Sequence, residues 1–313
     1  MAILKCIVKD IGFFMNNMSD ISRRHHFIPQ FYLKGFYEGD SFVVYDKEFN
    51  KFKKDNQTTK MVMFERDRNI ITVNGIKTDD IEKLYTNLDT NFSDLFKIIQ
   101  QKEYPYELLS IDGIRLLRQY IAIQFWRTPL TDPFVDNFIA NMDLSIFPSP
   151  IFINGKKMGE SDEFKSFLQE KDFRYYFRCF FLPHIFGAHH VTEEEVSHWT
   201  IYDVEDPQTW SKHIVGDHPF IFNELESVLL FNGDLIFPLS RSRVLVRRKN
   251  GQPVSRLPPD FSSKVSTLIF AQSQKYVTGP DKQYINDIKT MFERWWGKNK
   301  VHLLREEVLT YLK

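Results

Sequence analysis

The stretch LIFPLSRSRVLVRR, Leu235–Arg248, decides the fold class of this chain. It contains two runs rich in β-branched and apolar residues, Leu235–Leu239 and Arg243–Arg248, and both runs are predicted to be strands. The two strands follow each other with no helix between them, whereas a doubly wound α/β chain alternates its strands with helices. We therefore expect an α+β fold in which helices flank a mixed or antiparallel sheet.

The segments outside this stretch add both strands and helices. Similar strand patterns occur at Ser41–Asp46, Asn69–Val73, Trp199–Val204 and His213–Val215. A long helix is predicted to begin at Thr78, and a second helix is predicted to run from Ser110 to Arg127. Apolar residues recur on one face of each helix, so we expect the two to pack as an antiparallel pair. Further helices are predicted at Phe27–Phe36, Glu163–Phe186, Pro258 to about Tyr276, Tyr284–Trp296 and Val301–Leu312.

The composition allows one large core. The chain has 313 residues, of which 42% are hydrophobic and 15% aromatic, and a chain of this size buries about three quarters of its unfolded surface. We expect one domain over residues 22–313, preceded by an extension or arm at residues 1–21. Proline and glycine residues concentrate at 147–159, which indicates an excursion from that domain.

Charge and cysteine content restrict the classes of partner. The chain has 41 basic and 41 acidic residues, whereas a protein that coats nucleic acid non-specifically usually has a basic excess. Its two cysteines, Cys6 and Cys179, are too few for a disulfide framework or a cysteine-rich zinc site. We recognise no signal peptide and no transmembrane run. These features predict a cytoplasmic protein with no membrane association.

Four segments contain the distinctive motifs of the chain. They are RRHHFIPQFYLKGF at 23–36, IAIQFWRTP at 121–129, VGDHPFIF at 215–222 and FPLS at 237–240. Together, in this order, they resemble a bacterial family known only as a domain of unknown function, DUF4238, and the resemblance runs from about Ser22 to Val277. Proteins similar to these are scattered as accessory genes in bacteria, as toxins and antiviral effectors are. The family's third motif usually reads Ser-Asp-Asn-Pro, so Gly216 and His218 depart from it while Asp217 remains.

The first motif supplies the candidate base. His25 and His26 precede Pro29, which is predicted to begin a helix, and an imidazole near a helix N-terminus tends to be held neutral. A neutral imidazole can accept a proton or bind a metal. Adjacent residues point in different directions, so we expect a site to use one histidine but not both. Gln30 of the same motif is a further candidate. The alternative is that one histidine packs or caps and the other is exposed.

The string HHFIP, His25–Pro29, also resembles the opening of the His-Me-finger nucleases, in which a histidine activates water opposite a metal-bound phosphate. That family has an asparagine and a second histidine within a few tens of residues, on a hairpin and helix. Here the next histidine is His184, so the resemblance is local. The cofactor stays open, with a divalent metal as one option.

The second and third motifs supply polar partners. Gln124 and Arg127 are three positions apart on one predicted helix and so share a face. The Arg127 guanidinium could bind a phosphate or carboxylate as a bidentate fork, or it could satisfy the carbonyl groups of the last helical turn. Asp217 could orient an imidazole or bind a metal, although an aspartate before a proline more often caps the backbone.

Basic and acidic clusters close the list of candidates. Arg241, Arg243 and Arg247 would lie on one face of a strand and could contact a phosphate backbone, or they could be charges that guard a solvated edge strand. Thr192 followed by Glu193–Glu195 is interpreted as the solvated start of a helix, capped by the threonine.

These patterns lead to two hypotheses of different classes. The first is a nuclease-like enzyme that acts on phosphodiester or nucleotide substrates, RNA or DNA included, in antiviral defence or as a toxin. His25 or His26 would be its base, Arg127 its phosphate clamp, Gln124 an orienting group and Asp217 a partner carboxylate or metal ligand. The second is a non-catalytic module that binds a protein or phage component, with Trp295 and Trp296 as its first candidate contact.

Overall fold

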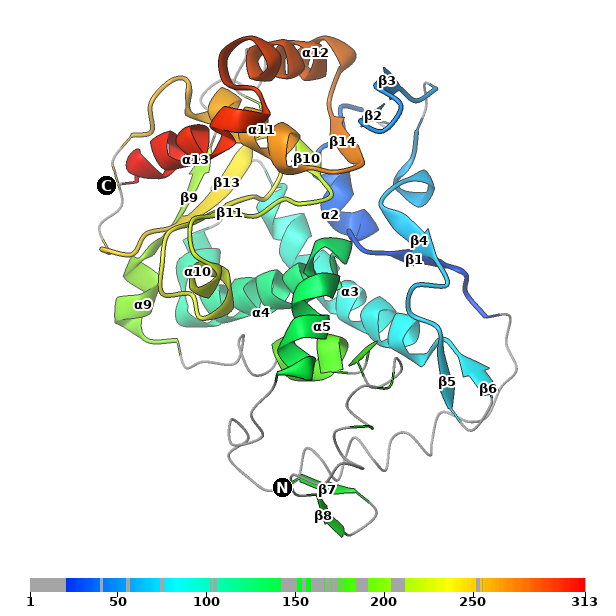
Figure 1. The fold of residues 1–313 in the computed structure, drawn as a ribbon. Coiled ribbons are helices and arrows are strands. Elements are labelled where there is room, and N and C mark those ends of the chain that lie inside the picture. The colour runs from blue at the N-terminus through cyan, green and yellow to red at the C-terminus, as the bar shows by residue number, and fades with distance from the viewer. Residues whose placement is uncertain are drawn as a thin grey trace.

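The computed structural model describes most of the chain between residues 21 and 312 (Figure 1). It leaves out residues 1–20, 40–41, 55–56, 74–75, 102, 104–105, 142–150, 154–155, 159–165, 167–169, 171–173, 176, 184–190, 204–211, 252–253, 255 and 313. Nearly all of the predicted arm therefore lies outside the described residues, as does His184. Of the predicted excursion, the described part is a hairpin formed by β7 (Ile151–Ile153) and β8 (Lys156–Met158).

The described part of the chain is a mixture of helices and small antiparallel sheets, which confirms the predicted α+β class. Its α-helices are α2 (Gln30–Lys34), α3 (Asp80–Ile99), α4 (Ile111–Arg127), α5 (Asp132–Ala140), α9 (Glu193–Ser197), α10 (Leu225–Leu229), α11 (Phe261–Gln272), α12 (Lys282–Met291) and α13 (Val301–Thr310). Among the described residues, no helix combines the length and the apolar content that a membrane-spanning segment needs.

Within the described residues, the strands form two four-stranded sheets and three two-stranded pairs. One sheet has the order β11 (Ile221–Phe222), β12 (Leu235–Pro238), β13 (Arg243–Arg247), β9 (Trp199–Asp203). The other has the order β10 (Val215–Gly216), β14 (Tyr276–Gly279), β2 (Val43–Asp46), β3 (Lys51–Phe52). β1 (Arg24–His26) pairs with β4 (Phe64–Arg66), β5 (Ile71–Val73) with β6 (Ile76–Thr78), and β7 with β8.

The sheet built on β12 and β13 divides the core into two parts. All residues of these two strands are buried, and successive side chains point to opposite faces. Phe237 and Leu245, which are paired across the strands, pack with α3 and α4, while Ile236 and Val244 pack with α11, α12 and α13. Figure 1 shows these two groups of helices on opposite sides of the strands. The stretch Leu235–Arg248 therefore positions both layers.

Helices α3 and α4 run antiparallel, as predicted. Arg127 at the end of α4 contacts Asp89 near the middle of α3, whereas Tyr120 packs on Phe92 and Phe96 farther along α3. Large aromatic side chains fill the space between the helices. The Ser110 side chain begins α4 by accepting a hydrogen bond from the Gly113 backbone N–H.

Two predicted elements need correction. The helix expected to reach Tyr276 ends at Gln272, and Tyr276–Gly279 is strand β14 instead. This segment lies between β10 and β2 and gains backbone hydrogen bonds on both sides, which outweighs local helical preference. The paired histidines lie in strand β1, and helix α2 begins only at Gln30.

Candidate active site

The facing sides of α3 and α4 carry polar residues at helical spacing. Glu82, Tyr85 and Asp89 lie on one face of α3, and Tyr120, Gln124 and Arg127 lie on one face of α4. These six residues, with His26 of β1, are called the interhelical cluster below. Two of the sequence motifs meet here, because Gln124 and Arg127 come from the second motif and His26 from the first.

Arg127 is the charge at the centre of the interhelical cluster. Its Nη1 donates to Asp89 Oδ1 over 2.7 Å, and its guanidinium lies 4.3 Å from the centre of the Tyr85 ring. Its Nε is buried with no hydrogen-bond partner. Its Nη2 donates to none of the residues that the structure describes. The pair with Asp89 and the contact with the aromatic ring therefore hold the guanidinium in place and leave donors for another group.

The His26 imidazole is neutral at neutral pH. Its Nε2 is 3.1 Å from the Thr59 carbonyl oxygen, so this nitrogen bears the hydrogen and donates it. Burial lowers the pKa of His26 to about 4, and the positive charge of Arg127 acts in the same direction. Nδ1 is then the acceptor nitrogen at neutral pH. Gln30 is one contact away, because its Oε1 accepts a hydrogen bond from Thr59 Oγ1 over 3.1 Å.

Several polar atoms of the interhelical cluster are buried without a partner. Gln124 Nε2 donates to the Phe27 carbonyl oxygen over 2.8 Å and so ties α4 to the end of β1, but Gln124 Oε1 has no donor. The Tyr120 hydroxyl group is likewise buried and unpartnered. A buried polar atom without a hydrogen bond costs about 1–3 kcal/mol. Such atoms indicate a place where a ligand or ordered water completes the hydrogen bonding.

Two carboxyl groups of α3 complete the electrostatics of the cluster. Burial raises the pKa of Asp89, although the adjacent Arg127 opposes this effect. Burial also raises the pKa of Glu82, again against the effect of Arg127. The pKa of His26 is lowered and the pKa values of Asp89 and Glu82 are raised, so the imidazole and carboxyl pKa values lie closer together than they ordinarily do. Such shifts favour proton exchange between groups in one site.

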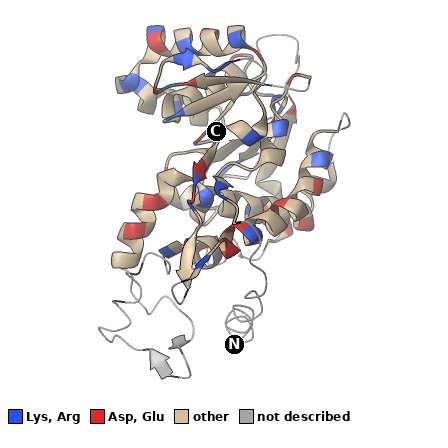
Figure 2. Cartoon of the chain, turned by 90° about the vertical axis from the view of Figure 1, so that its right-hand side faces the viewer, with Lys and Arg blue, Asp and Glu red and all other residues tan. Residues whose placement is uncertain are grey.

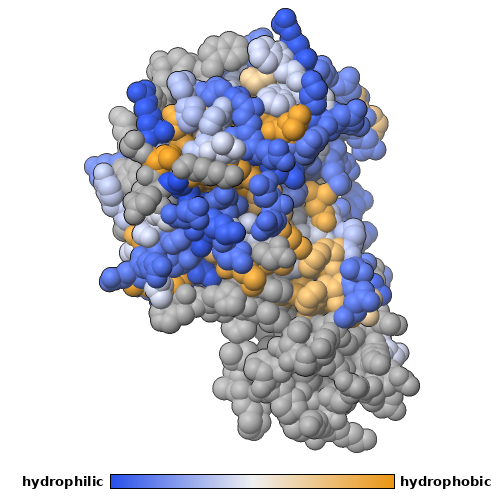
Figure 3. Space-filling model, turned by 60° about the vertical axis from the view of Figure 1, so that its left-hand side comes forward, coloured by the Kyte–Doolittle hydropathy of each residue, from blue (hydrophilic) through white to orange (hydrophobic). Residues whose placement is uncertain are grey.

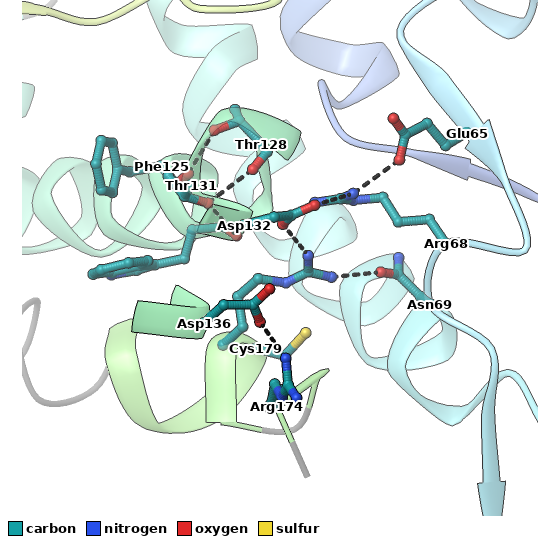
Figure 4. Close-up of polar contacts among 12 residues, drawn as sticks. Glu65, Arg68, Asn69, Phe125, Thr128, Thr131, Asp132, Asp136, Arg174 and Cys179 are labelled. Atoms are coloured by element: carbon teal, nitrogen blue, oxygen red, sulfur yellow. Dashed lines mark hydrogen bonds and ion pairs between the residues drawn. The ribbon is translucent and has the colours of Figure 1, made fainter. Parts of the chain in front are cut away.

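A second polar network adjoins the first through Glu82. Figure 4 shows the part of this network around Asp132. Asn69 donates to Glu82 Oε2 over 2.9 Å, and its side-chain oxygen accepts a hydrogen bond from Arg178. Asp132 accepts two hydrogen bonds from Arg68, at 2.8 and 2.7 Å, and one from Arg178 at 2.7 Å. The bidentate pair and the shared carboxylate connect α5 to the turn between β4 and β5, where Arg68 lies. Arg68 Nε and Arg178 Nε are buried without a hydrogen-bond partner, and Asn69 links this network to the interhelical cluster through Glu82.

His25 belongs to the supporting structure and not to the cluster. Its Nδ1 accepts the backbone N–H of Asn69 over 2.7 Å, and its Nε2 donates to the Ser22 carbonyl oxygen over 2.8 Å. Both ring nitrogens are used by the backbone, and the side chain is fully buried. Of the two predicted bases, His26 is the one with a free acceptor. The expectation that one histidine acts and the other packs fits this arrangement.

Asp217 lies away from the cluster, at the end of α11. Its carboxylate accepts backbone N–H groups of Gln274, Lys275 and Tyr276 at 2.8, 2.6 and 3.2 Å. The Lys47 ammonium group donates to the carbonyl oxygens of Phe270 and Ser273 at the same turn. An anion on the amides and a cation on the carbonyls together hold the turn between α11 and β14. The structure thus gives Asp217 the backbone-capping role that was the alternative to catalysis.

The three arginines expected to meet a phosphate backbone do not form a solvated row. Arg243 is buried and donates to Asp203 and to the carbonyl oxygens of Ile99 and Glu103. Arg247 is buried and donates to Glu195 and to the Gly233 carbonyl oxygen. The partly exposed Arg241 lies 3.6 Å from Glu38. The expectation of a shared, exposed face is wrong because β13 is central in its sheet and both of its faces are covered.

No part of the described structure presents an evident metal centre. Within these residues, no group of three or more histidine, cysteine, aspartate or glutamate side chains is placed to hold a metal ion. Cys179 donates to or accepts from the Tyr85 hydroxyl group at 2.9 Å, and burial raises the pKa of its thiol. Positive and negative residues are interspersed over the described elements (Figure 2).

Sequence reasoning missed four residues of the interhelical cluster: Glu82, Tyr85, Asp89 and Tyr120. The available signal was their spacing. Glu82 and Asp89 are seven positions apart and flank Tyr85 on the face of α3 that also buries Phe92. A charged residue on the apolar face of a helix is unusual because burial of an unpaired charge is costly. Asp89 in such a position indicated a buried basic partner.

Comparison with known proteins places the first part of the chain in a family. Residues 24–178 match the family model described as a protein of unknown function, DUF4238. The matched segment contains the first two motifs and every residue of the interhelical cluster, whereas GDHP and FPLS lie beyond it. No curated protein and no solved structure matches the chain. The chain therefore contains a DUF4238 domain over residues 24–178.

Proposed function

We propose that this chain is an enzyme that hydrolyses phosphodiester or nucleotide substrates at the interhelical cluster. The observation that carries the proposal is the convergence of His26, Gln124 and Arg127, which come from two separate motifs. A neutral histidine with a free acceptor nitrogen, close enough to a fixed guanidinium for that charge to lower its pKa, suits a reaction in which water attacks a phosphorus atom.

Each group has a proposed role in that reaction. His26 Nδ1 takes a proton from the attacking water, and the free donors of Arg127 bind the phosphoryl oxygens. Glu82, whose pKa is raised by burial, is the acid that returns a proton to the leaving oxygen, while the Asp89 carboxylate holds Arg127 in place. Gln124 Oε1 and the Tyr120 hydroxyl group orient the water or the substrate. The water's oxygen bonds to phosphorus as the ester P–O bond breaks. The base removes one proton from the water and the acid gives one proton to the leaving oxygen, so the protons balance.

A substrate of nucleotide size is favoured over a long nucleic acid. Extended binding of a phosphate backbone needs several exposed basic side chains, each of which adds to the salt dependence of affinity. Arg243 and Arg247 are committed to internal contacts and are not free for that purpose. The single fixed charge of Arg127 matches one phosphate group.

The proposal is tested by turnover. The purified full chain is incubated with a panel of cyclic nucleotides, dinucleotides, short RNA and short DNA, with added Mg²⁺ or Mn²⁺ and, in a parallel series, with a chelator. Product release is followed by chromatography. We expect hydrolysis of at least one small phosphodiester. The metal arms establish whether a divalent cofactor is used. Absence of turnover across the whole panel would reject the proposal.

Two matched variants on α4 separate chemistry from general charge. Arg127→Lys retains the charge but loses the planar fork, and we expect it to lower kcat at least tenfold with a smaller change in KM. Arg115→Lys makes the same replacement on the exposed side of the helix, where the arginine pairs with Asp112. It is expected to leave both constants unchanged. Equal kcat values for the two variants would remove Arg127 from the site.

A cellular consequence follows if the enzyme acts as a toxin or antiviral effector. Expression in a bacterial host should then slow growth, and His26→Gln should relieve the effect at the same soluble yield. Growth inhibition that persists in the variant would disconnect toxicity from the interhelical cluster.

Binding without catalysis is the second candidate, and one surface feature favours it. Trp295 and Leu303 near the C-terminal end are 63% and 45% exposed, and aromatic residues often anchor protein contacts. Figure 3 shows apolar side chains in separate groups among hydrophilic ones on one face of the molecule. If the substrate panel gives no turnover, a protein partner contacting Trp295 becomes the leading proposal, and Trp295→Ala should weaken its capture.

A further inference from the structure

Helix α4 carries a second buried arginine on the side opposite the interhelical cluster. Arg118 and Arg127 are about two and a half helical turns apart, so they project in opposite directions. Arg118 faces α9 and β13, where it meets Glu195 and Arg247. Only 3% of its side chain is exposed. Its surroundings are therefore independent of the proposed active site.

The carboxylate beside Arg118 is already taken. Arg247 grips Glu195 with two parallel hydrogen bonds, Nε to Oε1 and Nη2 to Oε2, both 3.1 Å long. The Trp199 indole N–H donates to the same Oε1 over 3.0 Å. Arg118 Nη1 is left 3.8 Å from that oxygen, beyond hydrogen-bonding distance. Two guanidinium groups thus share one negative charge, and Arg247 holds it.

Arg118 makes no hydrogen bond with any residue that the structure describes. Its Nε is buried and unpartnered, whereas its two terminal nitrogens retain a little contact with solvent. Arg118 has therefore lost most of its water while it shares a carboxylate with Arg247 and makes no hydrogen bond to it, which is an incomplete pairing for a buried cation. Arg118 and Arg247 carry two positive charges, and Glu195 supplies one negative charge. A bound anion would balance the remaining positive charge.

The residue whose ring contacts the Arg118 guanidinium, Phe231, has a strained backbone conformation. The Arg118 guanidinium lies 4.7 Å from the centre of the Phe231 ring, which also packs on Trp199. Phe231 has a φ of 52°, a left-handed conformation that bulky residues rarely adopt. Such a conformation costs about 1–3 kcal/mol and is found preferentially at ligand sites. The aromatic face fixes the plane of the guanidinium and so presents its terminal nitrogens as a fork.

We propose that Arg118, backed by Arg247, binds the oxyanion group of a small ligand, a phosphate or a carboxylate. Two oxygens of the anion would accept hydrogen bonds from the two terminal nitrogens of Arg118 in the bidentate manner that arginine favours. The anion supplies the missing negative charge. Phe231 and Trp199 provide an apolar wall beside it. Glu195 positions Arg247 by accepting two of its hydrogen bonds.

The test is thermal unfolding of the full chain in titrations with phosphate, with acetate and with chloride at matched ionic strength. We expect the midpoint to rise and saturate with phosphate or acetate but not with chloride. A response to phosphate alone identifies a phosphate ligand, and a response to acetate alone identifies a carboxylate ligand. Absence of a saturable response to both anions would overturn the proposal.

Variants assign the response to Arg118. Arg118→Met should abolish the anion-dependent rise, while Arg115→Met on the same helix should retain it. In calorimetric titrations with the responding anion, Arg118→Lys should bind at least tenfold more weakly, because it keeps the charge and loses the fork. An unchanged affinity in Arg118→Lys would contradict the proposal even if Arg118→Met fails to fold. His26→Gln should leave the affinity unchanged, which separates this site from the proposed active site.

Discussion

Arg127 and Arg118 lie on the same helix and are almost equally buried, but their surroundings differ. Arg127 has a carboxylate at 2.7 Å and stacks on Tyr85. Arg118 stacks on Phe231, and its nearest carboxylate, at 3.8 Å, is held by another arginine. Arg127 is compensated within the chain, and Arg118 is not.

The difference separates two uses of buried charge. A compensated guanidinium can hold helices together and still offer its spare donors to a substrate. An uncompensated guanidinium contributes little to folding and is instead prepared for an anion that arrives later. Variants of compensated and uncompensated groups should therefore differ in the free energy of unfolding.

Removal of the compensated charge should have the largest effect. Arg127→Met leaves Asp89 partly buried without its cation, and we expect a loss of about 2–4 kcal/mol. The loss is below that of a fully buried pair because the Asp89 side chain is 25% exposed. Arg118→Met in anion-free buffer should change stability by less than about 1 kcal/mol, in either direction. Urea unfolding measures the free energy of unfolding of both variants. Equal losses in the two variants would contradict the distinction between compensated and uncompensated charge.

Asp217 provides a compensated charge outside α4. In Asp217→Asn, the new amide N–H₂ group must face backbone N–H donors that the carboxylate now accepts. We expect a loss of about 2 kcal/mol. Urea unfolding would show it as a lower midpoint with an unchanged slope. A variant as stable as the parent chain would mean that the turn after α11 does not depend on this carboxylate.

His213 extends the comparison to an uncompensated imidazole. Neither ring nitrogen has a partner, and burial lowers the pKa of His213 to about 3. The unfolded chain therefore binds the proton first as the pH falls below about 6.5, and stability is lost in that direction. Between pH 6 and pH 5, His213→Leu should reduce the loss by about 1.4 kcal/mol per pH unit. An identical pH dependence in variant and parent would show that the ring is hydrated or charged in the fold.

The exposed arginine of α4 should have the smallest effect. Arg115 pairs with Asp112 at 2.8 Å, but both side chains are largely in solvent. Arg115→Met should change the free energy of unfolding by less than about 0.5 kcal/mol. The value is read from the same urea titrations. A larger loss would mean that position on α4, rather than compensation of charge, governs the effects at Arg118 and Arg127.

Sequence patterns gave a good account of α3, α4 and the strands of Leu235–Arg248, because these elements satisfy local spacing and tertiary packing together. They failed at Tyr276–Gly279, where the helical pattern of α11 continues but the segment pairs with strands on both sides. They also misjudged Glu195. Thr192 caps α9 as expected, accepting the Glu195 backbone N–H, but the Glu195 side chain turns inward to Arg247.

The candidate site was predictable only in part for a related reason. The motifs identified His26, Gln124 and Arg127, and in the structure the two motifs that contain them are joined by the hydrogen bond from Gln124 to the Phe27 carbonyl oxygen. Asp89 and Glu82 were not identified, because a helical carboxylate is ordinarily a solvated charge and only the opposite helix shows that these two are half-buried. Asp217 was identified by its motif, but its carboxylate accepts hydrogen bonds from three backbone N–H groups and so stabilises the turn after α11.

The most direct test of the account measures turnover and thermal stability together in His26→Gln and Asp217→Asn. Glutamine can keep the hydrogen bond to the Thr59 carbonyl oxygen but has no basic nitrogen. With a substrate from the panel, we predict a fall in kcat of at least about 100-fold for His26→Gln at a nearly unchanged midpoint. For Asp217→Asn we predict a lower midpoint and an unchanged kcat below it. Full turnover in His26→Gln, or loss of turnover in folded Asp217→Asn, would contradict the assignment of the active site.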